Sequence, residues 1–194
     1  MKIDVELSDF MTQKRAIVVH FSHHANMRDD GIFPDDLINA IANRHIWPLS
    51  CSVVWPGHSM DVVGSVGVIF EPTLDSVLCV SNMDAGSYVL PDGTDQSGGV
   101  PLTADSLAAT FEVVGTYNEW RLRGAEVAGI FVLNSNNIMV KRPMEFDVNG
   151  TKFQTITAQK IELADVFAAF PSMKIYTMGA AGRIEISPSA HLSF

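Results

Sequence analysis

Short apolar runs separated by turn residues recur along the chain, and this pattern is typical of β-strands. The predicted strands cover residues 16–21, 49–55, 66–70, 76–80, 119–123 and 127–133, with a further strand at 138–141, short strands around Phe146 and Phe153, and a closing hairpin that turns at 179–182. We expect most of these strands to pair antiparallel, because the connections between them are short.

Three segments, residues 34–45, 103–111 and 163–170, carry helical periodicity instead. In the last of them Leu163, Val166, Phe167 and Phe170 recur at helical spacing, and we expect all four side chains to face the core. The sequence therefore predicts an α+β fold, with mostly antiparallel, curved sheets and about three helices.

Residues 1–194 show no change of composition that would mark a domain boundary, so we expect a single α+β domain. Residues 140–194 either complete the same sheet or form a C-terminal cap. The longest polar, glycine-rich stretch is residues 82–101, and we expect it to be a mobile loop beside a cleft.

The net charge of −9 and the pI near 5 narrow the range of partners. The 13 basic residues are scattered, which disfavours nucleic acid as a partner. No apolar run is long enough to cross a membrane, and the first ten residues carry three acids and no secretory signal, so we expect a cytoplasmic location. Cys51 and Cys79 lie in apolar runs and are expected to be inert thiols.

The stretch YNEWRLRGAEVAGIFVL holds the most promising carboxylates. On a strand, Glu119 and Arg121 share one face while Trp120 occupies the other. This polar face is either solvated and laced by ion pairs, or it lines a cleft into which Glu119 points. Glu126, which opens the next apolar strand, is the competing candidate.

Two further groups of residues carry side chains that could take part in chemistry. In HFSHH, His20 to His24, two imidazoles share a strand face, which would suit a metal-assisted hydrolase, but no third ligand stands at a convincing spacing and no metal site is predicted. Ser50 and Ser52 alternate along another strand. Hydroxyls in such positions most often bond to the backbone or to a neighbouring strand.

Three blocks resemble parts of the ADP-ribosyltransferase-like proteins, especially the DarT-type toxins and the tRNA 2′-phosphotransferases. The blocks are HFSHHANMRDDGIFP, VGSVGVIFEPTLDSVLCV and YNEWRLRGAEVAGIFV, and together they span about residues 16–133. This resemblance implies a cleft between two small sheets that holds NAD+ as the substrate. The sequence departs from the pattern of the arginine-directed members of this family, because Tyr117 stands where the first acid of their Glu-x-Glu pair would be.

The resemblance also implies roles for individual residues. Glu119, or as second choice Glu126, would stabilise the cation that forms as nicotinamide leaves. The implied NAD-binding residues are His20 for the ribose, the hydroxyls of Ser22, Ser50 and Ser52, the aromatic rings of Trp55 and Tyr117, and Arg121.

Two functions of different class follow. The first is an NAD+-consuming mono-ADP-ribosyltransferase that modifies a protein or small-molecule acceptor. The alternative is a non-catalytic partner-binding or inhibitory interaction module with an acidic surface. The two functions require different geometries. The enzyme needs His20 and Glu119 on facing walls of one cleft, whereas the binding module does not.

Overall fold

The computed structural model describes residues 3–21, 35–43, 48–59 and 65–188. These residues include the α-helices α1 (Ile3–Lys14), α2 (Asp35–Asn43), α3 (Ala104–Thr110) and α4 (Leu163–Ala169), and the short 3-10 helix η1 (Leu74–Ser76). The strands are β1 (Ile17–Phe21), β2 (Leu49–Val54), β3 (Val66–Glu71), β4 (Val77–Ser81), β5 (Tyr88–Val89), β6 (Asp95–Gln96), β7 (Glu119–Leu122), β8 (Glu126–Val132), β9 (Ile138–Val148), β10 (Thr151–Ile161), β11 (Ile175–Gly179) and β12 (Gly182–Ile186).

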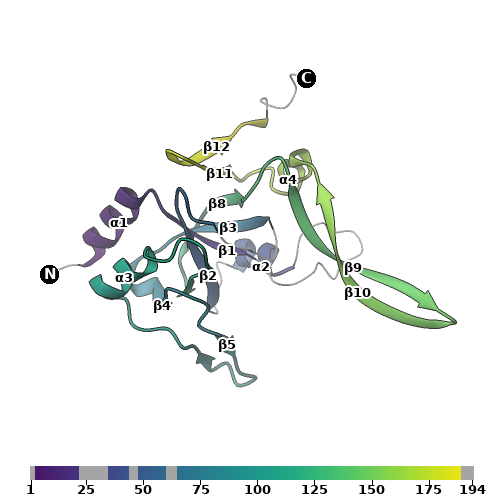
Figure 1. Ribbon diagram of the computed structural model, residues 1–194, viewed down its shortest axis with the longest axis horizontal. Helices are drawn as coiled ribbons and strands as arrows, with labels where there is room; N and C mark the ends of the chain where they lie inside the picture. The colour runs from purple at the N-terminus through teal and green to yellow at the C-terminus, as the bar shows by residue number, and fades with distance from the viewer. Residues whose placement is uncertain (1–2, 22–34, 44–47, 60–64, 189–194) are drawn as a thin grey trace.

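Eight strands form one sheet in the order β12-β11-β8-β3-β1-β2-β7-β4 (Figure 1). All neighbouring pairs are antiparallel except β8 and β11, which run parallel. The α+β prediction and the mostly antiparallel sheet are confirmed. The predicted helices correspond to α2, α3 and α4, and α1 is an additional one whose Leu7 and Met11 are buried.

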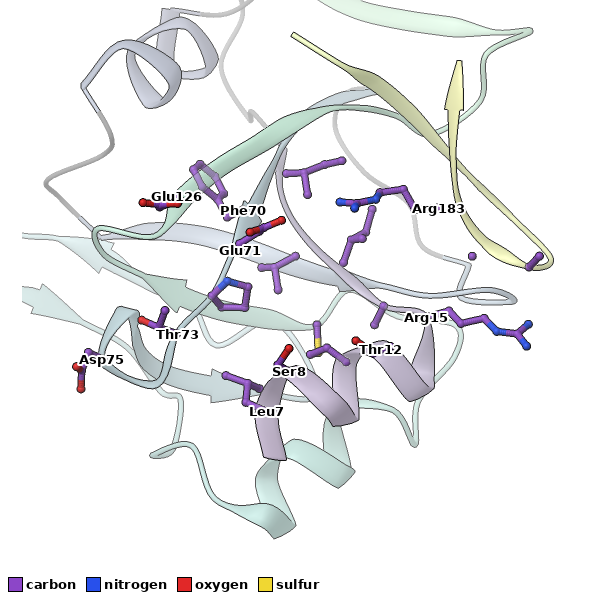
Figure 2. A pocket seen from close by; sticks show the side chains of 18 residues that line it. Leu7, Ser8, Thr12, Arg15, Phe70, Glu71, Thr73, Asp75, Glu126 and Arg183 are labelled. Carbon is purple, nitrogen blue, oxygen red and sulfur yellow. The ribbon is translucent and has the colours of Figure 1, made fainter. Parts of the chain in front are cut away.

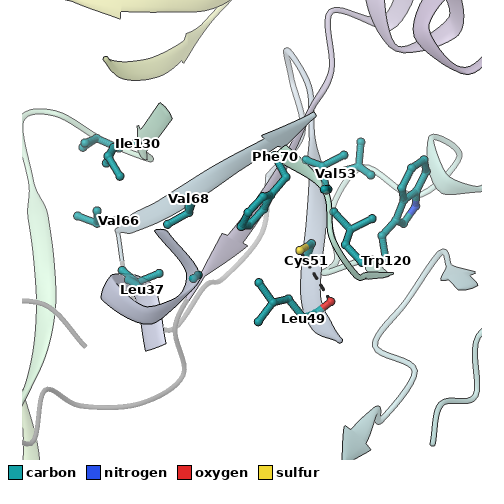
Figure 3. Close-up of a cluster of buried hydrophobic side chains, with 14 of the residues drawn as sticks. Leu37, Leu49, Cys51, Val53, Val66, Val68, Phe70, Trp120 and Ile130 are labelled. Atoms are coloured by element: carbon teal, nitrogen blue, oxygen red, sulfur yellow. Dashed lines mark hydrogen bonds between the residues drawn. The ribbon is translucent and has the colours of Figure 1, made fainter. Parts of the chain in front are cut away.

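The sheet buries both of its faces, in two separate clusters. The larger cluster contains Cys51 and Trp120 (Figure 3). It also contains Val18 and buried side chains from all four helices. The smaller cluster, on the other face, contains Val19 and Phe131. Because side chains alternate along a strand, β1, β2, β3, β8 and β11 contribute to both clusters, and this explains their nearly continuous apolar runs in the sequence.

Cys51 shows how closed the larger cluster is. Its side chain is fully buried, and its Sγ lies 3.8 Å from the carbonyl oxygen of Leu49 (Figure 3). Burial raises the pKa of the Cys51 thiol far above its ordinary value, with the nearby Arg121 charge opposing the shift in part. The thiol therefore stays protonated and inert.

Strands β9 and β10 form a separate two-stranded ribbon that projects from the body (Figure 1). The sequence predicted only short strands here, but each strand has eleven residues. Asn149 and Gly150 turn the chain between them with φ of 55° and 80°. Asn-Gly with both residues at positive φ is the favoured two-residue hairpin turn, so a signal for the long hairpin was present in the sequence.

The closing hairpin is confirmed, because β11 and β12 pair around residues 179–182. None of the helices in the described ranges has both the length and the apolar character needed to cross a membrane.

Leu163 and Val166 of helix α4 are buried, as is Phe170 directly after the helix, while Phe167 is half-buried and packs against the same cluster. All four side chains therefore face the core, as the sequence predicted, but to different depths. We expect Phe170→Ala to lower the free energy of unfolding by about 3–5 kcal/mol, because Phe170 is 5% exposed and its removal leaves a cavity. The matched control is Phe167→Ala, which should cost clearly less. Chemical denaturation of both variants measures the difference, and equal losses would contradict this packing.

Candidate functional site

Five of the predicted site residues lie together on one face of the sheet. Ser50 and Ser52 come from β2, Glu119 and Arg121 from β7, and Tyr117 immediately precedes β7. Their strand neighbours Cys51 and Trp120 pack into the larger cluster, so alternation places these five on the opposite face. The structure thus gathers a polar group at one end of the smaller cluster.

Tyr117 and Glu119 are both held in place by hydrogen bonds. The hydroxyls of Tyr117 and Ser50 lie 3.1 Å apart. Burial raises the pKa of the Tyr117 phenol far above its ordinary value, so the phenol is neutral. Glu119 is 3% exposed, and its Oε2 accepts a hydrogen bond of 2.9 Å from the backbone N–H of Ala85.

Arg121 is buried as deeply as Glu119. It is 4% exposed and forms an ion pair with Asp95 through its terminal nitrogen. Among the described residues its Nε has no hydrogen-bond partner. The expectation that Glu119 and Arg121 form an exposed or cleft-lining wall is therefore wrong, because another part of the chain covers them.

The covering segment is residues 82–101, which the sequence predicted as a mobile loop. It contains the β5–β6 hairpin, which supplies Asp95 to Arg121, while Ala85 binds Glu119. A pair of backbone hydrogen bonds of 2.8 Å joins Val80 to Val100 where the segment ends. These contacts dock the segment on the sheet. The sequence Pro91-Asp92-Gly93 is a turn signal that could have indicated the hairpin.

The remaining predicted residues do not join this group. His20 lies on the opposite face of the sheet, where its Nδ1 is 2.7 Å from the carbonyl oxygen of Ser50. Trp55 belongs to the larger cluster and stacks on His58 with ring centroids 3.8 Å apart. Ser22, His23 and His24 lie outside the described residues. His20 and Glu119 therefore do not face each other across one cleft.

A missed residue, Asn118, fixes where β7 begins. Its buried side chain accepts a hydrogen bond of 2.7 Å from the N–H of Val53 and donates one of 2.9 Å to the carbonyl oxygen of the same residue. A side-chain amide can pair in this way with a strand's backbone. Asn118 thereby sets the position of Glu119 directly after it.

A cavity of about 830 Å³ lies elsewhere, between α1 and the ends of β1 and β3 (Figure 2). The turn between β11 and β12 borders it. Its volume falls within the range of small-molecule sites. Glu126, the second-choice carboxylate, is exposed on its wall, directly opposite Glu71 in the β3–β8 pairing.

The charges around this cavity are separated by sign. Glu71, Asp75 and Glu126 border one side, and Arg15 and Arg183 border the other (Figure 2). The Arg183 guanidinium stacks 4.6 Å from the centroid of the Tyr176 ring. Such an arrangement of charges complements a small molecule that carries charges of both signs. Neither His20 nor Glu119 lines this cavity.

No protein-family model, curated protein or solved structure matches the chain. The resemblance to ADP-ribosyltransferase-like proteins therefore stays a prediction. Within the part of the chain that the structure describes, no three His, Cys, Asp or Glu side chains gather as they would around a metal ion.

The chemistry open to the polar group follows from its contacts. A carboxylate that stabilises a developing cation must point at the reacting atoms. In this structure one carboxylate oxygen of Glu119 accepts a hydrogen bond from the backbone N–H of Ala85, and the Arg121 guanidinium forms an ion pair with Asp95. Both groups serve to hold residues 82–101 against the sheet.

We expect Asp95→Ala to lower the free energy of unfolding by about 3–5 kcal/mol, because Arg121 would keep a buried charge without its partner. The control is Asp92→Asn, which removes an exposed charge from the same hairpin, keeps an oxygen to accept the backbone N–H of Thr94, and should change the melting temperature little. Thermal and chemical unfolding measure both variants. Equal stability of Asp95→Ala and the wild type would show that the ion pair does not hold the segment.

Proposed function

We propose that this protein is a non-catalytic binding module, and that the β9–β10 ribbon is its binding element. The observation that carries the proposal is a group of exposed apolar side chains toward the tip of the ribbon, on the same face as the residues that anchor its base in the core. At the base, Ile138, Val140 and Ile161 are buried in the larger cluster. Toward the tip the same face presents large apolar side chains to solvent.

The two faces of the ribbon differ in chemistry. The pairing register puts Met144, Phe146, Val148 and Phe153 on the apolar face, where they are 42–48% exposed. The rings of Phe146 and Phe153 stack with centroids 5.5 Å apart. On the other face Asp147 stands opposite Lys152, and Gln154 donates a hydrogen bond of 2.8 Å to Glu145. The second face thus carries paired polar side chains and the exposed Ile156, while the first concentrates four exposed apolar side chains.

The energetics favour covering the apolar face. A two-stranded ribbon alone is marginally stable in water. Covering a half-exposed apolar side chain contributes about 1 kcal/mol, since full burial contributes about 1.5–3 kcal/mol. Four such side chains in one place are typical of a protein–protein interface.

The charge of the ribbon indicates the kind of partner. Residues 138–161 carry four basic and two acidic residues, a net charge of +2, whereas the rest of the chain carries nine and twenty, a net charge of −11. A basic ribbon with an apolar face fits a protein surface that is apolar and bordered by carboxylates. Among the described residues, Glu119 and Arg121 are engaged within the chain, which supports binding over catalysis.

The proposal predicts that the purified protein leaves NAD+ intact, and that neither Glu119→Gln nor Glu126→Gln changes this. Nicotinamide release, followed by chromatography, is the measurement. Turnover by the wild type that falls ~100-fold or more in Glu119→Gln, with Glu126→Gln unaffected and both variants folded, would instead establish the transferase.

A photo-crosslinking amino acid placed at Phe146 tests the binding element directly. In cells that naturally make the protein, we expect a discrete crosslinked product from position 146, because this side chain faces the partner. Purified wild-type protein should compete the product away, whereas Phe146→Ser/Phe153→Ser should not. The matched control is position 156, since Ile156 is 56% exposed on the opposite face of the ribbon.

Two outcomes would show that the apolar face is not the binding surface. One is the same crosslinked product from positions 146 and 156. The other is a product that the Phe146→Ser/Phe153→Ser protein competes away as well as the wild type does.

A further inference from the structure

We infer that the surface bound by the ribbon is the acidic lobe of a second copy of this chain, where the acidic lobe is residues 77–105. This inference rests on the proposed function and names its partner. It follows from the match between two surfaces that one chain carries in different places.

The acidic lobe has the charge that the ribbon requires. It contains four aspartates and no lysine or arginine. Asp84, Asp92 and Asp105 are exposed, while Asp95 is neutralised by Arg121. The ribbon carries a net charge of +2, and its exposed Lys152 and Lys160 lie on the face opposite the apolar one, with Lys160 3.7 Å from Glu162. Opposite net charges on two surfaces steer their association.

The lobe also offers apolar surface. Its exposed large apolar side chains are Leu78, Met83, Tyr88, Val89 and Val100, with exposed fractions from 38% to 59%. Nearly all the other exposed large apolar side chains of the described residues lie on the ribbon; Val114 and Ile184 are the exceptions. The exposed apolar surface of the described chain is thus concentrated in two places, one basic and one acidic.

The lobe is already ordered before any partner arrives. Backbone hydrogen bonds join Val80 to Val100 at 2.8 Å and Gly98 to Ala85 at 3.1 Å. The Arg121–Asp95 ion pair and the bond from Ala85 to Glu119 attach it to the sheet. A preformed surface avoids the entropy loss of ordering a loop upon binding.

The ribbon of one chain does not cover its own lobe. Figure 1 shows the ribbon projecting from the body, with its tip well separated from β5 in the lobe. The contact is therefore between molecules, and it joins two different surfaces. A contact of this kind leaves a free ribbon at one end and a free lobe at the other, so copies add head to tail into a ring or an open chain.

Two variants, each disabled in one surface, test this arrangement. Phe146→Ser/Phe153→Ser disables the ribbon, and Met83→Ser/Val89→Ser disables the lobe. All four side chains are at least 42% exposed, so both variants should fold, which circular dichroism and melting temperature verify. Val114→Ser and Ile156→Ser are controls, since each removes an exposed apolar side chain outside the two contact surfaces.

Sedimentation velocity over a hundredfold range of concentration is the measurement. We expect the wild type and both controls to grow beyond a dimer as concentration rises, and each double variant alone to stay monomeric. An equimolar mixture of the two double variants should form a heterodimer and stop there, because only one intact ribbon and one intact lobe can meet. Added salt should weaken every assembly.

A mixture that stays monomeric while the wild type dimerises would overturn the head-to-tail contact and indicate ribbon packing on ribbon. A wild type that is monomeric throughout would also overturn it. If position 146 then still crosslinks competitively to a different protein, the binding function stands and only the identity of the partner is wrong. If position 146 gives no competed product either, the proposed function fails as well.

Discussion

The burial of two charged side chains on β7 constrains much of this structure. Glu119 and Arg121 lie under a segment of the same chain, and a charge removed from water needs a partner close by. Ala85 and Asp95 supply those partners. A polar, glycine-rich segment that could not bury itself by apolar contacts is thereby fixed on the sheet. Together with the backbone hydrogen bonds between Val80 and Val100, these two contacts hold residues 82–101 on the sheet.

The burial of Glu119 and Arg121 also bears on the function of the protein. Because the lobe occupies the two charged groups, the face that a transferase would use is covered. The lobe at the same time becomes a rigid, acidic, partly apolar surface at the β4 end of the sheet. The ribbon, basic and apolar, leaves the body elsewhere (Figure 1). Complementary surfaces on different sides of one chain are what repeated association requires. The cavity beside α1 is lined by neither surface.

Most strands could be predicted from sequence because each is a short apolar run between turn residues, and the closing hairpin and three of the helices followed from local signals. The opposite faces of Trp120 and Glu119 also followed from alternation. The burial of Glu119 could not, since it depends on Ala85, 34 positions away, and local pattern carries no information about which distant segment docks. The separation of His20 from Glu119 has a similar origin. It depends on which residue of β1 faces which cluster, and a strand buried on both faces gives no polar alternation to show this. The long ribbon was missed because its polar residues interrupt the apolar pattern, although Asn149-Gly150 marked the turn.

Amide hydrogen exchange, followed by mass spectrometry on dilute and on assembled protein, tests the central claim most directly, since it reports on the lobe and the ribbon in one experiment. Our account predicts slow exchange in residues 82–101 in both samples, because the lobe is docked before binding. It predicts fast exchange around residues 144–155 in the dilute sample and clear slowing there upon assembly. Fast exchange throughout residues 82–101 in the dilute protein, or a ribbon whose exchange is unchanged upon assembly, would contradict the account.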